Sequence, residues 1–171
     1  MKKTIIISGF PGVGKSHLCK EMCEFPYLKI YDSDSSNFSW LEPGVRNPDF
    51  PNNYIKHIKS LIGVADYILV SSHEVVRKRL AEENIRYVLV FPGHDLYDEY
   101  MSRYRMRNSS EAFIDHISKN FHSFVNQCEN DIFAIRYELG AGCFLSDTIR
   151  DMSIAIGFDD YIKKSNDTVN V

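Results

Sequence analysis

The feature that most constrains the fold is a run of eight residues near the N-terminus, Gly9–Ser16, which reads Gly-Phe-Pro-Gly-Val-Gly-Lys-Ser. The apolar run Thr4–Ser8 precedes it and predicts a short buried strand, and the residues from Lys15 to Glu24 predict a helix. The glycines let the backbone fold into a concave loop whose N–H groups point inward. A strand, a glycine-rich loop and a helix in direct succession indicate an α/β architecture.

The same octapeptide carries chemistry, because it matches the pattern G-x-x-x-x-G-K-[ST] at every fixed position. Inward N–H groups and the positive end of the following helix favour phosphate oxygens, Lys15 reaches the β- and γ-phosphates, and Ser16 offers a hydroxyl to Mg²⁺. The sequence lacks a guanine-reading Asn-Lys-x-Asp pattern, which favours ATP as the nucleotide. The residues predicted to bind ATP are Gly9, Gly12, Val13, Gly14, Lys15, Ser16 and His17, with Ser16 as the metal ligand.

Apolar and amphipathic segments alternate along the rest of the chain. Further strands are predicted over Tyr27–Asp32, Asp66–Ser71, Arg86–Phe91 and Ile132–Leu139. Helices are predicted over Tyr54–Ile62, His73–Asn84, Leu96–Tyr104, Phe113–Cys128 and Asp147–Ile156. A proline-containing stretch between Ser33 and Asn52 reads as a loop. Five alternations predict a three-layer α/β/α P-loop NTPase fold with a five-stranded parallel sheet. The sequence contains no repeat or long linker, so residues 1–171 are predicted to form one domain.

Composition argues against several classes of protein. Of 171 residues, 44% are hydrophobic and 25% are charged, which are the values of a globular domain. Lys and Arg number 20 against 23 Asp and Glu, and this net charge of −3 argues against a nucleic-acid partner. The apolar run at the N-terminus is too short for an export signal or a membrane span. Four cysteines without a Cys-x-x-Cys pair indicate reduced thiols and hence the cytoplasm.

The loop Gly9–Lys15 resembles the G-x-P-G-x-G-K loop of adenylate kinase and related small P-loop kinases. Residues 31–40 and 44–51 resemble nucleoside-monophosphate-kinase-like proteins that are often found in bacteriophages. The resemblance implies an ATP-dependent transferase of nucleotide metabolism that converts a nucleoside or deoxynucleoside monophosphate to its diphosphate, in the host cytoplasm if it is phage-encoded. It also implies that residues 33–62 bind the acceptor and that residues 95–110 form a short lid.

Four arginines take roles from the same resemblance. Arg103 and Arg107, spaced i,i+4 on one helix face, are expected to stabilise the transferring phosphoryl group from the lid. Arg46 and Arg77 are expected to grip the phosphate of the acceptor, as arginines from these two regions do in similar enzymes. An exposed basic turn of a helix is an equally good account of Arg77.

Asp32 and Asp34 lie at the carboxyl end of the second predicted strand, the edge where open α/β sheets bind ligands. A carboxylate there could hold a Mg²⁺-bound water, accept a hydrogen bond from a sugar hydroxyl, or act as a base toward an attacking hydroxyl. The alternative is turn formation, because Asp-Ser-Asp-Ser-Ser is rich in turn formers. The third predicted strand ends in Ser71 and Ser72, without the aspartate that many P-loop NTPases use for Mg²⁺, which strengthens the case for Asp32 or Asp34.

Three functions are consistent with these residues. The leading one is a nucleoside monophosphate kinase in which Lys15, Arg103, Arg107 and Asp34 are catalytic, with Phe38 and Trp40 either stacking on a base or packing locally. The first alternative is a kinase for a hydroxyl acceptor, such as a nucleoside, a sugar or a polynucleotide 5′ end, with Asp34 or Asp32 as base. The second is a regulatory module that binds ATP or GTP and contacts a partner without transferring phosphate.

Overall fold

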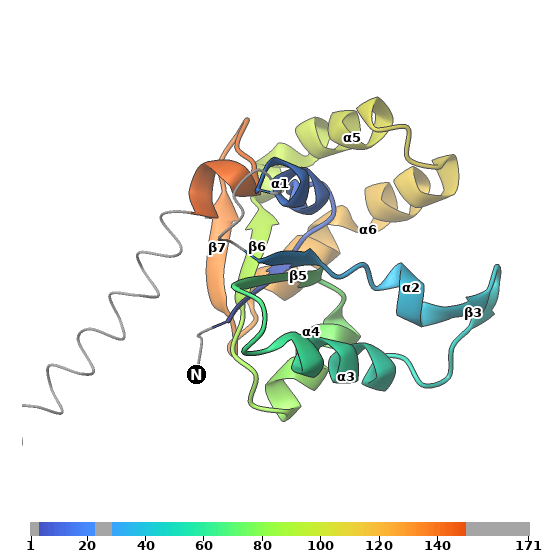
Figure 1. The fold of residues 1–171 in the computed structure, drawn as a ribbon. Coiled ribbons are helices and arrows are strands. Elements are labelled where there is room, and N and C mark those ends of the chain that lie inside the picture. The colour runs from blue at the N-terminus through green and yellow to red at the C-terminus, as the bar shows by residue number, and fades with distance from the viewer. Residues whose placement is uncertain (1–3, 23–28, 150–171) are drawn as a thin grey trace, which may run out of the picture.

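A computed structural model describes residues 4–22 and 29–149. Within them, one five-stranded sheet has the strand order β2-β5-β1-β6-β7 (Figure 1). Its strands are β1 (Ile5–Gly9), β2 (Ile30–Asp32), β5 (Tyr67–Ser71), β6 (Val88–Pro92) and β7 (Ile135–Leu139). Every neighbouring pair is parallel, which confirms the predicted parallel sheet.

Helices flank this sheet on both sides. They are α1 (Lys15–Met22), α3 (Asn52–Leu61), α4 (Glu74–Glu82), α5 (Tyr97–Met106) and α6 (Glu111–Glu129), and the 3₁₀ turn η1 (His94–Leu96) leads into α5. Because crossovers between parallel strands are right-handed, the strand order places α1 on one face and α3, α4 and α6 on the other. The result is the three-layer α/β/α fold that the sequence predicts.

The central strands of the sheet are buried, and they support the polar residues at its carboxyl edge. Ile68, Leu69 and Val70 of β5 are fully buried, and all five residues of β6 are buried. A parallel sheet covered on both faces requires such uninterrupted apolar runs. Each side chain of this size contributes about 1.5–3 kcal/mol when it leaves water. The carboxyl ends of the strands, where the loop after β1 and Asp32 of β2 emerge, therefore stand on a rigid base.

The stretch from Ser33 to Asn52, predicted as a loop, contains a short helix and a hairpin. Helix α2 (Ser36–Ser39) follows β2, and β3 (Trp40–Glu42) pairs antiparallel with β4 (Val45–Arg46). Gly44 has φ 84° in the turn of the hairpin, a conformation that glycine adopts without strain. Figure 1 shows the hairpin projecting from the body of the molecule. Strands of two or three residues are too short for hydrophobic periodicity to reveal.

Other element boundaries agree with the prediction to within a few residues. Helix α6 begins after Ser110, whose hydroxyl accepts a hydrogen bond from the N–H of Phe113 at 3.3 Å, as an N-cap residue does. The predicted end of the first helix at Glu24, the start of the second strand at Tyr27, and residues 150–156 of the last helix lie outside the described residues. In the parts of the chain that the structure describes, no helix is both long and apolar enough to cross a membrane.

Candidate functional site

The P-loop, Gly9–Ser16, turns tightly between β1 and α1. Gly12 and Gly14 have φ values of 88° and 95°, which residues with a side chain rarely adopt. A Cβ on Gly9 would lie 2.9 Å from Cγ2 of Val13, and a Cβ on Gly12 would lie 2.9 Å from a ring carbon of Tyr104. Local geometry therefore requires these glycines. The first N–H groups of α1 have no intrahelical partners and are available to an anion.

The ammonium group of Lys15 folds back onto the P-loop. Its Nζ donates hydrogen bonds to the carbonyl oxygens of the first two P-loop residues. The pKa of Lys15 is lowered from 10.5 to about 8, chiefly by burial; the charge of Asp32 opposes this shift, that of Arg107 adds to it, and that of Asp34 opposes it. Their influence on one ammonium group means that three further residues singled out from the sequence lie around the P-loop.

The lowered pKa of Lys15 predicts that nucleotide affinity weakens above pH 8. A bound triphosphate favours the ammonium form, so the complex holds a proton that free protein loses as the pH rises through about 8. We expect the Kd for ATP to rise by up to about tenfold per pH unit between pH 8 and 9.5. Titration with a fluorescent ATP analogue between pH 7.5 and 9.5 measures this slope. In Lys15→Arg the guanidinium stays protonated and the slope should vanish. An equal slope in both proteins would contradict the assignment.

Helix α5 and the loop after β7 hold the outer side of the P-loop. The hydroxyl of Tyr104, on α5, donates to the carbonyl of Pro11 at 2.7 Å. From the other side, the N–H of Leu145 donates to the carbonyl of Val13 at 2.8 Å. Residues 95–110, expected to form a short lid, comprise η1, α5 and the turn before α6, and α5 buries Tyr100 and Tyr104. The P-loop is therefore held in shape by the protein itself.

Arg103 is part of the same support. Its guanidinium donates to the carbonyls of Gly12 at 3.0 Å and Cys143 at 2.8 Å, and it pairs with the carboxylate of Glu99. It also lies 3.9 Å from the centre of the Phe144 ring, and the side chain is only 10% exposed. The sequence predicts a direct contact between Arg103 and the transferring phosphoryl group. The structure instead engages this guanidinium with P-loop and neighbouring backbone groups.

Arg107, its partner in the predicted pair, is differently placed. It is exposed at the C-terminal end of α5, where Nε donates to the hydroxyl of Ser109 at 2.7 Å. Its guanidinium lies over the rings of Tyr104 and Phe113, at 5.0 and 5.2 Å. Its charge also acts on Lys15, and the exposed guanidinium keeps donors beyond the one that Ser109 accepts.

The two candidate carboxylates follow β2. Asp32 ends the strand and is half-buried, whereas Asp34 is exposed two residues later. Oδ1 of Asp34 accepts a hydrogen bond from the N–H of Ser36 at 2.8 Å, so this residue also shapes the turn into α2. A carboxylate offers about four acceptor positions, and one hydrogen bond leaves capacity for a ligand. The structure thus accommodates both the turn and the functional interpretation of Asp34.

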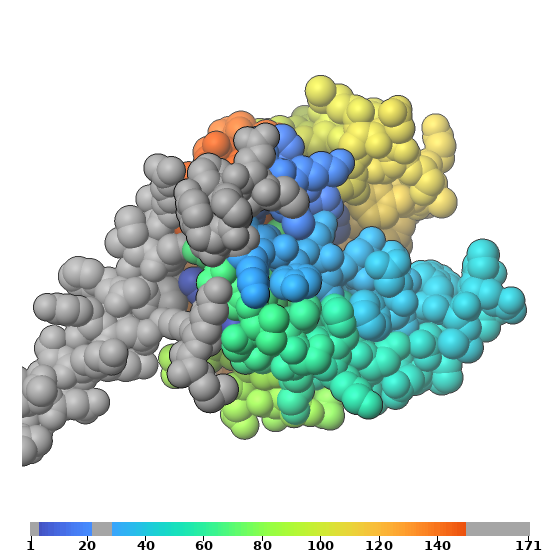
Figure 2. Space-filling view, viewed as in Figure 1, coloured from blue at the N-terminus to red at the C-terminus, as the bar shows by residue number. Residues whose placement is uncertain are grey.

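The hairpin brings Trp40 and Arg46 together. They are a cross-strand pair, and the guanidinium of Arg46 lies 4.1 Å from the centre of the Trp40 ring. Trp40 is 41% exposed, so one part of the indole remains available to a ligand. Figure 2 shows a hollow between the side of the molecule that carries the hairpin and the side formed by α5 and α6. The hairpin therefore borders a groove rather than packing into the core.

Four charged groups act on His73, at the start of α4. The surrounding protein lowers the pKa of His73 by desolvation, and the positive charges of Arg46, Lys15 and His116 lower it further, while Asp34 raises it. These groups come from the hairpin, the P-loop, α6 and the segment after β2. The sequence gives no signal for His116, because it lies in a helical run with no motif around it and only the fold brings its charge to act on His73.

Phe38, Ser16 and His17 complete the predicted set. The ring of Phe38 lies 5.1 Å from that of Tyr54 and 4.8 Å from that of His57, so it packs locally beside the groove. Ser16 is exposed at the start of α1, and the imidazole of the exposed His17 pairs with Glu21 at 2.9 Å.

The donor set fits a Mg²⁺ ion bound together with a nucleotide. Across residues 4–22 and 29–149 there is no group of three or more His, Cys, Asp or Glu side chains that could hold a metal by themselves. Mg²⁺ does not need one, because it commonly uses one or two protein oxygens together with substrate phosphates and water. The hydroxyl of Ser16, at the start of α1, and the carboxylate of Asp32, near Lys15, are oxygen donors of the required kind.

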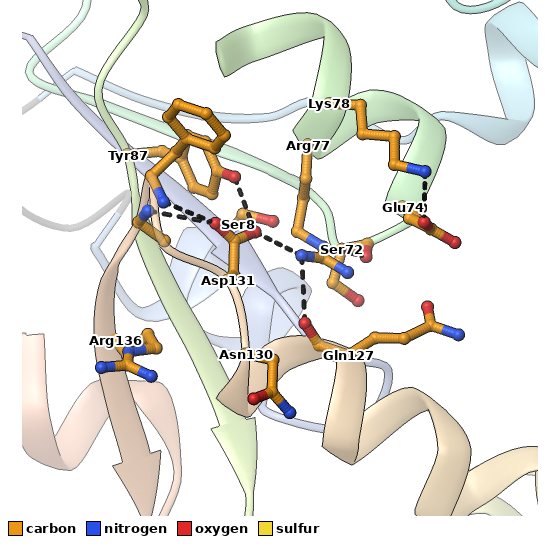
Figure 3. A network of polar contacts seen from close by, with 12 residues as sticks. Ser8, Ser72, Glu74, Arg77, Lys78, Tyr87, Gln127, Asn130, Asp131 and Arg136 are labelled. Carbon is orange, nitrogen blue, oxygen red and sulfur yellow. Dashed lines mark hydrogen bonds and ion pairs between the residues drawn. The ribbon is translucent and has the colours of Figure 1, made fainter.

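Arg77 does not join these residues at the groove. It is 5% exposed and forms an ion pair with Asp131, which also accepts a hydrogen bond from Tyr87 at 2.8 Å (Figure 3). Its Nε donates to the carbonyl of Ser72 at 3.0 Å, and Nη1 approaches the carbonyl of Gln127 at 3.5 Å. Neither the acceptor contact nor the exposed basic turn considered from the sequence describes this arrangement, in which Arg77 ties α4 to the end of α6.

The buried pair predicts that Arg77→Met destabilises the protein without changing acceptor binding. Removing one partner leaves the Asp131 carboxylate buried without a cation, which costs about 3–5 kcal/mol. Arg79→Met is the control, because its ion pairs with Glu82 and Glu83 are at the surface and are worth about 1 kcal/mol or less. Urea unfolding measures both. A stable Arg77→Met protein with a raised acceptor KM would instead restore the acceptor-binding role.

Comparison with known proteins identifies the fold but not a family. No protein-family description matches the chain, and no curated protein resembles it in sequence. Among solved structures, the crystal structure of a gluconokinase from Sinorhizobium meliloti 1021 superposes with a TM-score of 0.58. The match covers 96% of this chain and 98% of that chain at 14% sequence identity. The chain thus has the α/β fold of a P-loop kinase.

Proposed function

We propose that the protein transfers the γ-phosphoryl group of ATP to a small acceptor. The observation that carries the proposal is the P-loop with the charged groups around it: the charges of Asp32, Asp34 and Arg107 act on Lys15, and those of Arg46 and Lys15 act on His73. The P-loop would hold the donor phosphates, Lys15 and Arg107 would stabilise charge on the transferring group, and Arg46 would hold the acceptor. The likeness to a gluconokinase supports a phosphotransferase.

We further propose that the acceptor is a hydroxyl group. A monophosphate acceptor was expected to be gripped by two arginines, but Arg77 is buried against Asp131, which leaves Arg46. Two carboxylates beside Lys15 suit an acceptor that must lose a proton, whereas a phosphate acceptor is already ionised and needs no base. A sugar or sugar acid is consistent with the gluconokinase neighbour.

The proposed reaction needs no proton acceptor other than Asp34 or Asp32. The acceptor oxygen attacks the γ-phosphorus of ATP, its proton passes to the carboxylate of Asp34 or Asp32, and the bond from the γ-phosphorus to the bridging oxygen breaks to release ADP. Mg²⁺, held by Ser16 and Asp32 together with the phosphates, would neutralise phosphate charge. Arg107 and Lys15 supply donors toward the oxygens of the transferring group.

A second candidate, a nucleoside monophosphate acceptor, is favoured by the Trp40–Arg46 pair. The exposed indole could stack on a base, and the neighbouring guanidinium could bind a phosphate. This arrangement serves a nucleotide as well as it serves another planar or anionic acceptor.

The decisive test is an assay with ATP, Mg²⁺ and a panel of acceptors, with ADP release coupled to an optical readout. The panel contains sugars and sugar acids, nucleosides, ribo- and deoxynucleoside monophosphates, and an oligonucleotide with a 5′-hydroxyl. Turnover with a hydroxyl acceptor supports the first candidate, and turnover restricted to monophosphates supports the second. ATP binding without turnover on any acceptor would contradict both and favour a regulatory module.

A further inference from the structure

A chain of hydrogen bonds crosses the carboxyl edge of the sheet from β1 to β2. The hydroxyl of Ser8, in β1, donates to the carbonyl of Ser71, at the end of β5, at 3.1 Å. The N–H of Ser71 donates to the hydroxyl of Tyr54 at 3.3 Å. The hydroxyl of Tyr54, on α3, donates in turn to the carbonyl of Ser33. This series of hydrogen bonds ends at the carbonyl of Ser33, the residue between Asp32 and Asp34.

The packing around Tyr54 holds its hydroxyl in one position. Its side chain is fully buried, and its ring packs 5.1 Å from that of Phe38 and 6.1 Å from that of Phe50. Burial is the main cause that raises the pKa of Tyr54 to about 12, so the hydroxyl keeps its proton at neutral pH and remains the donor to Ser33. A buried hydroxyl with two partners has one orientation, unlike the same group in solvent.

The neighbouring residue ties down the rest of the same segment. Nδ2 of Asn53 donates to the carbonyl of Phe38 at 2.9 Å. The first turn of α3 therefore holds residues 33–38 at two points, on either side of Asp34. The segment has two further ties: the N–H of Ser33 donates to the carbonyl of Leu69 in β5 at 2.8 Å, and the N–H of Ser36 donates to Asp34. The N–H side of Ser33 is thus held by β5, and the chain beyond it, including Asp34, is held by the first turn of α3.

We propose that Tyr54 is a positioning residue for phosphoryl transfer: its hydroxyl, held at the end of β5, fixes the peptide between Ser33 and Asp34 and so sets the distance from the Asp34 carboxylate to the P-loop. The inference rests on the proposed function. It differs from that function in assigning a role to a buried side chain that touches neither nucleotide nor acceptor.

Tyr54→Phe keeps the ring and removes the hydroxyl. A catalytic group displaced by about 1 Å can cost about a hundredfold in rate, so we expect kcat to fall about tenfold to a hundredfold. The Kd for ATP should stay within about twofold of wild type, because the P-loop is held by Tyr104 and Leu145 instead. The fall should disappear in the Asp34→Asn background, because Tyr54 acts through that carboxylate.

Tyr87→Phe is the matched control. It also removes a buried tyrosine hydroxyl with a hydrogen bond, to Asp131, but in the network of Figure 3. Both variants should lose a similar amount of thermal stability, and only Tyr54→Phe should lose kcat. If Tyr54→Phe does not fold, Asn53→Ala cuts the other tie to the segment and should lower kcat in the same way.

The outcomes separate this inference from the proposed function. If wild-type protein transfers phosphate and Tyr54→Phe matches Tyr87→Phe in kcat, the positioning role is overturned. The role is also overturned if Tyr54→Phe lowers activity to the same extent in the Asp34→Asn background, because the hydroxyl would then act independently of that carboxylate. If wild-type protein transfers phosphate to no acceptor, the proposed function itself fails.

Discussion

Lys15→Met is expected to lower the rate of phosphoryl transfer by about a thousandfold or more while leaving the protein folded. Removing a positioned donor from a transition state costs about a hundredfold to a thousandfold, and a full positive charge on a transferring phosphoryl group is worth up to about 10⁵-fold. Methionine retains the length and apolar stem of lysine. Single-turnover transfer from labelled ATP, followed together with the circular dichroism of the variant, measures the loss and tests the fold.

Lys20→Met is the matched control for this substitution. Lys20 lies in the last turn of the same helix and is exposed, so its replacement removes the same charge without touching the P-loop. Its turnover should remain within about twofold of wild type, since surface substitutions of this kind rarely exceed about 0.5 kcal/mol. Equal losses in the two variants would show that the effect is one of net charge. An active Lys15→Met protein would remove the central element of the proposed site.

The sheet and the P-loop could be predicted because their signals are local. Uninterrupted apolar runs such as Ile68–Val70 mark central strands that are covered on both faces, and all five strands of the parallel sheet lie where they are predicted. Gly12 and Gly14 have positive φ, so the motif reports a backbone shape that few other sequences can form. The position of Asp32 could be predicted for the same reason, because it ends a strand and therefore lies at the carboxyl edge of the sheet.

The roles of the arginines could not be predicted, because they depend on partners far away in the chain. Arg77 is paired with Asp131, and Arg103 binds the carbonyl of Cys143. A charged side chain three residues into a helix has the same local pattern whether it faces solvent or a buried carboxylate. The hydrogen bond of Tyr54 could not be predicted for a related reason, since its apolar neighbours mark one face of a helix and only the fold brings its hydroxyl to Ser33.

The substitutions Asp32→Asn and Asp34→Asn carry the second large expected effect, and they distinguish the two classes of acceptor. With a hydroxyl acceptor, the aspartate that accepts the proton should lose about a hundredfold to ten-thousandfold in kcat when it becomes asparagine. The other should lose much less. Asparagine retains a side-chain carbonyl that can still accept the hydrogen bond from Ser36, so Asp34→Asn removes the charge and keeps the turn into α2.

The comparison is informative because a monophosphate acceptor predicts a different result. Its attacking oxygen is ionised before the reaction, so neither asparagine variant should lose more than about tenfold, provided that Mg²⁺ affinity is unchanged. Measuring kcat across Mg²⁺ concentrations separates loss of the ion, which excess metal restores, from loss of a base, which it does not. Asp98→Asn, an exposed aspartate in the first turn of α5, controls for charge. Large losses confined to one of the two aspartates would identify the base. Small losses in both would mean that neither aspartate acts as a base for a hydroxyl acceptor.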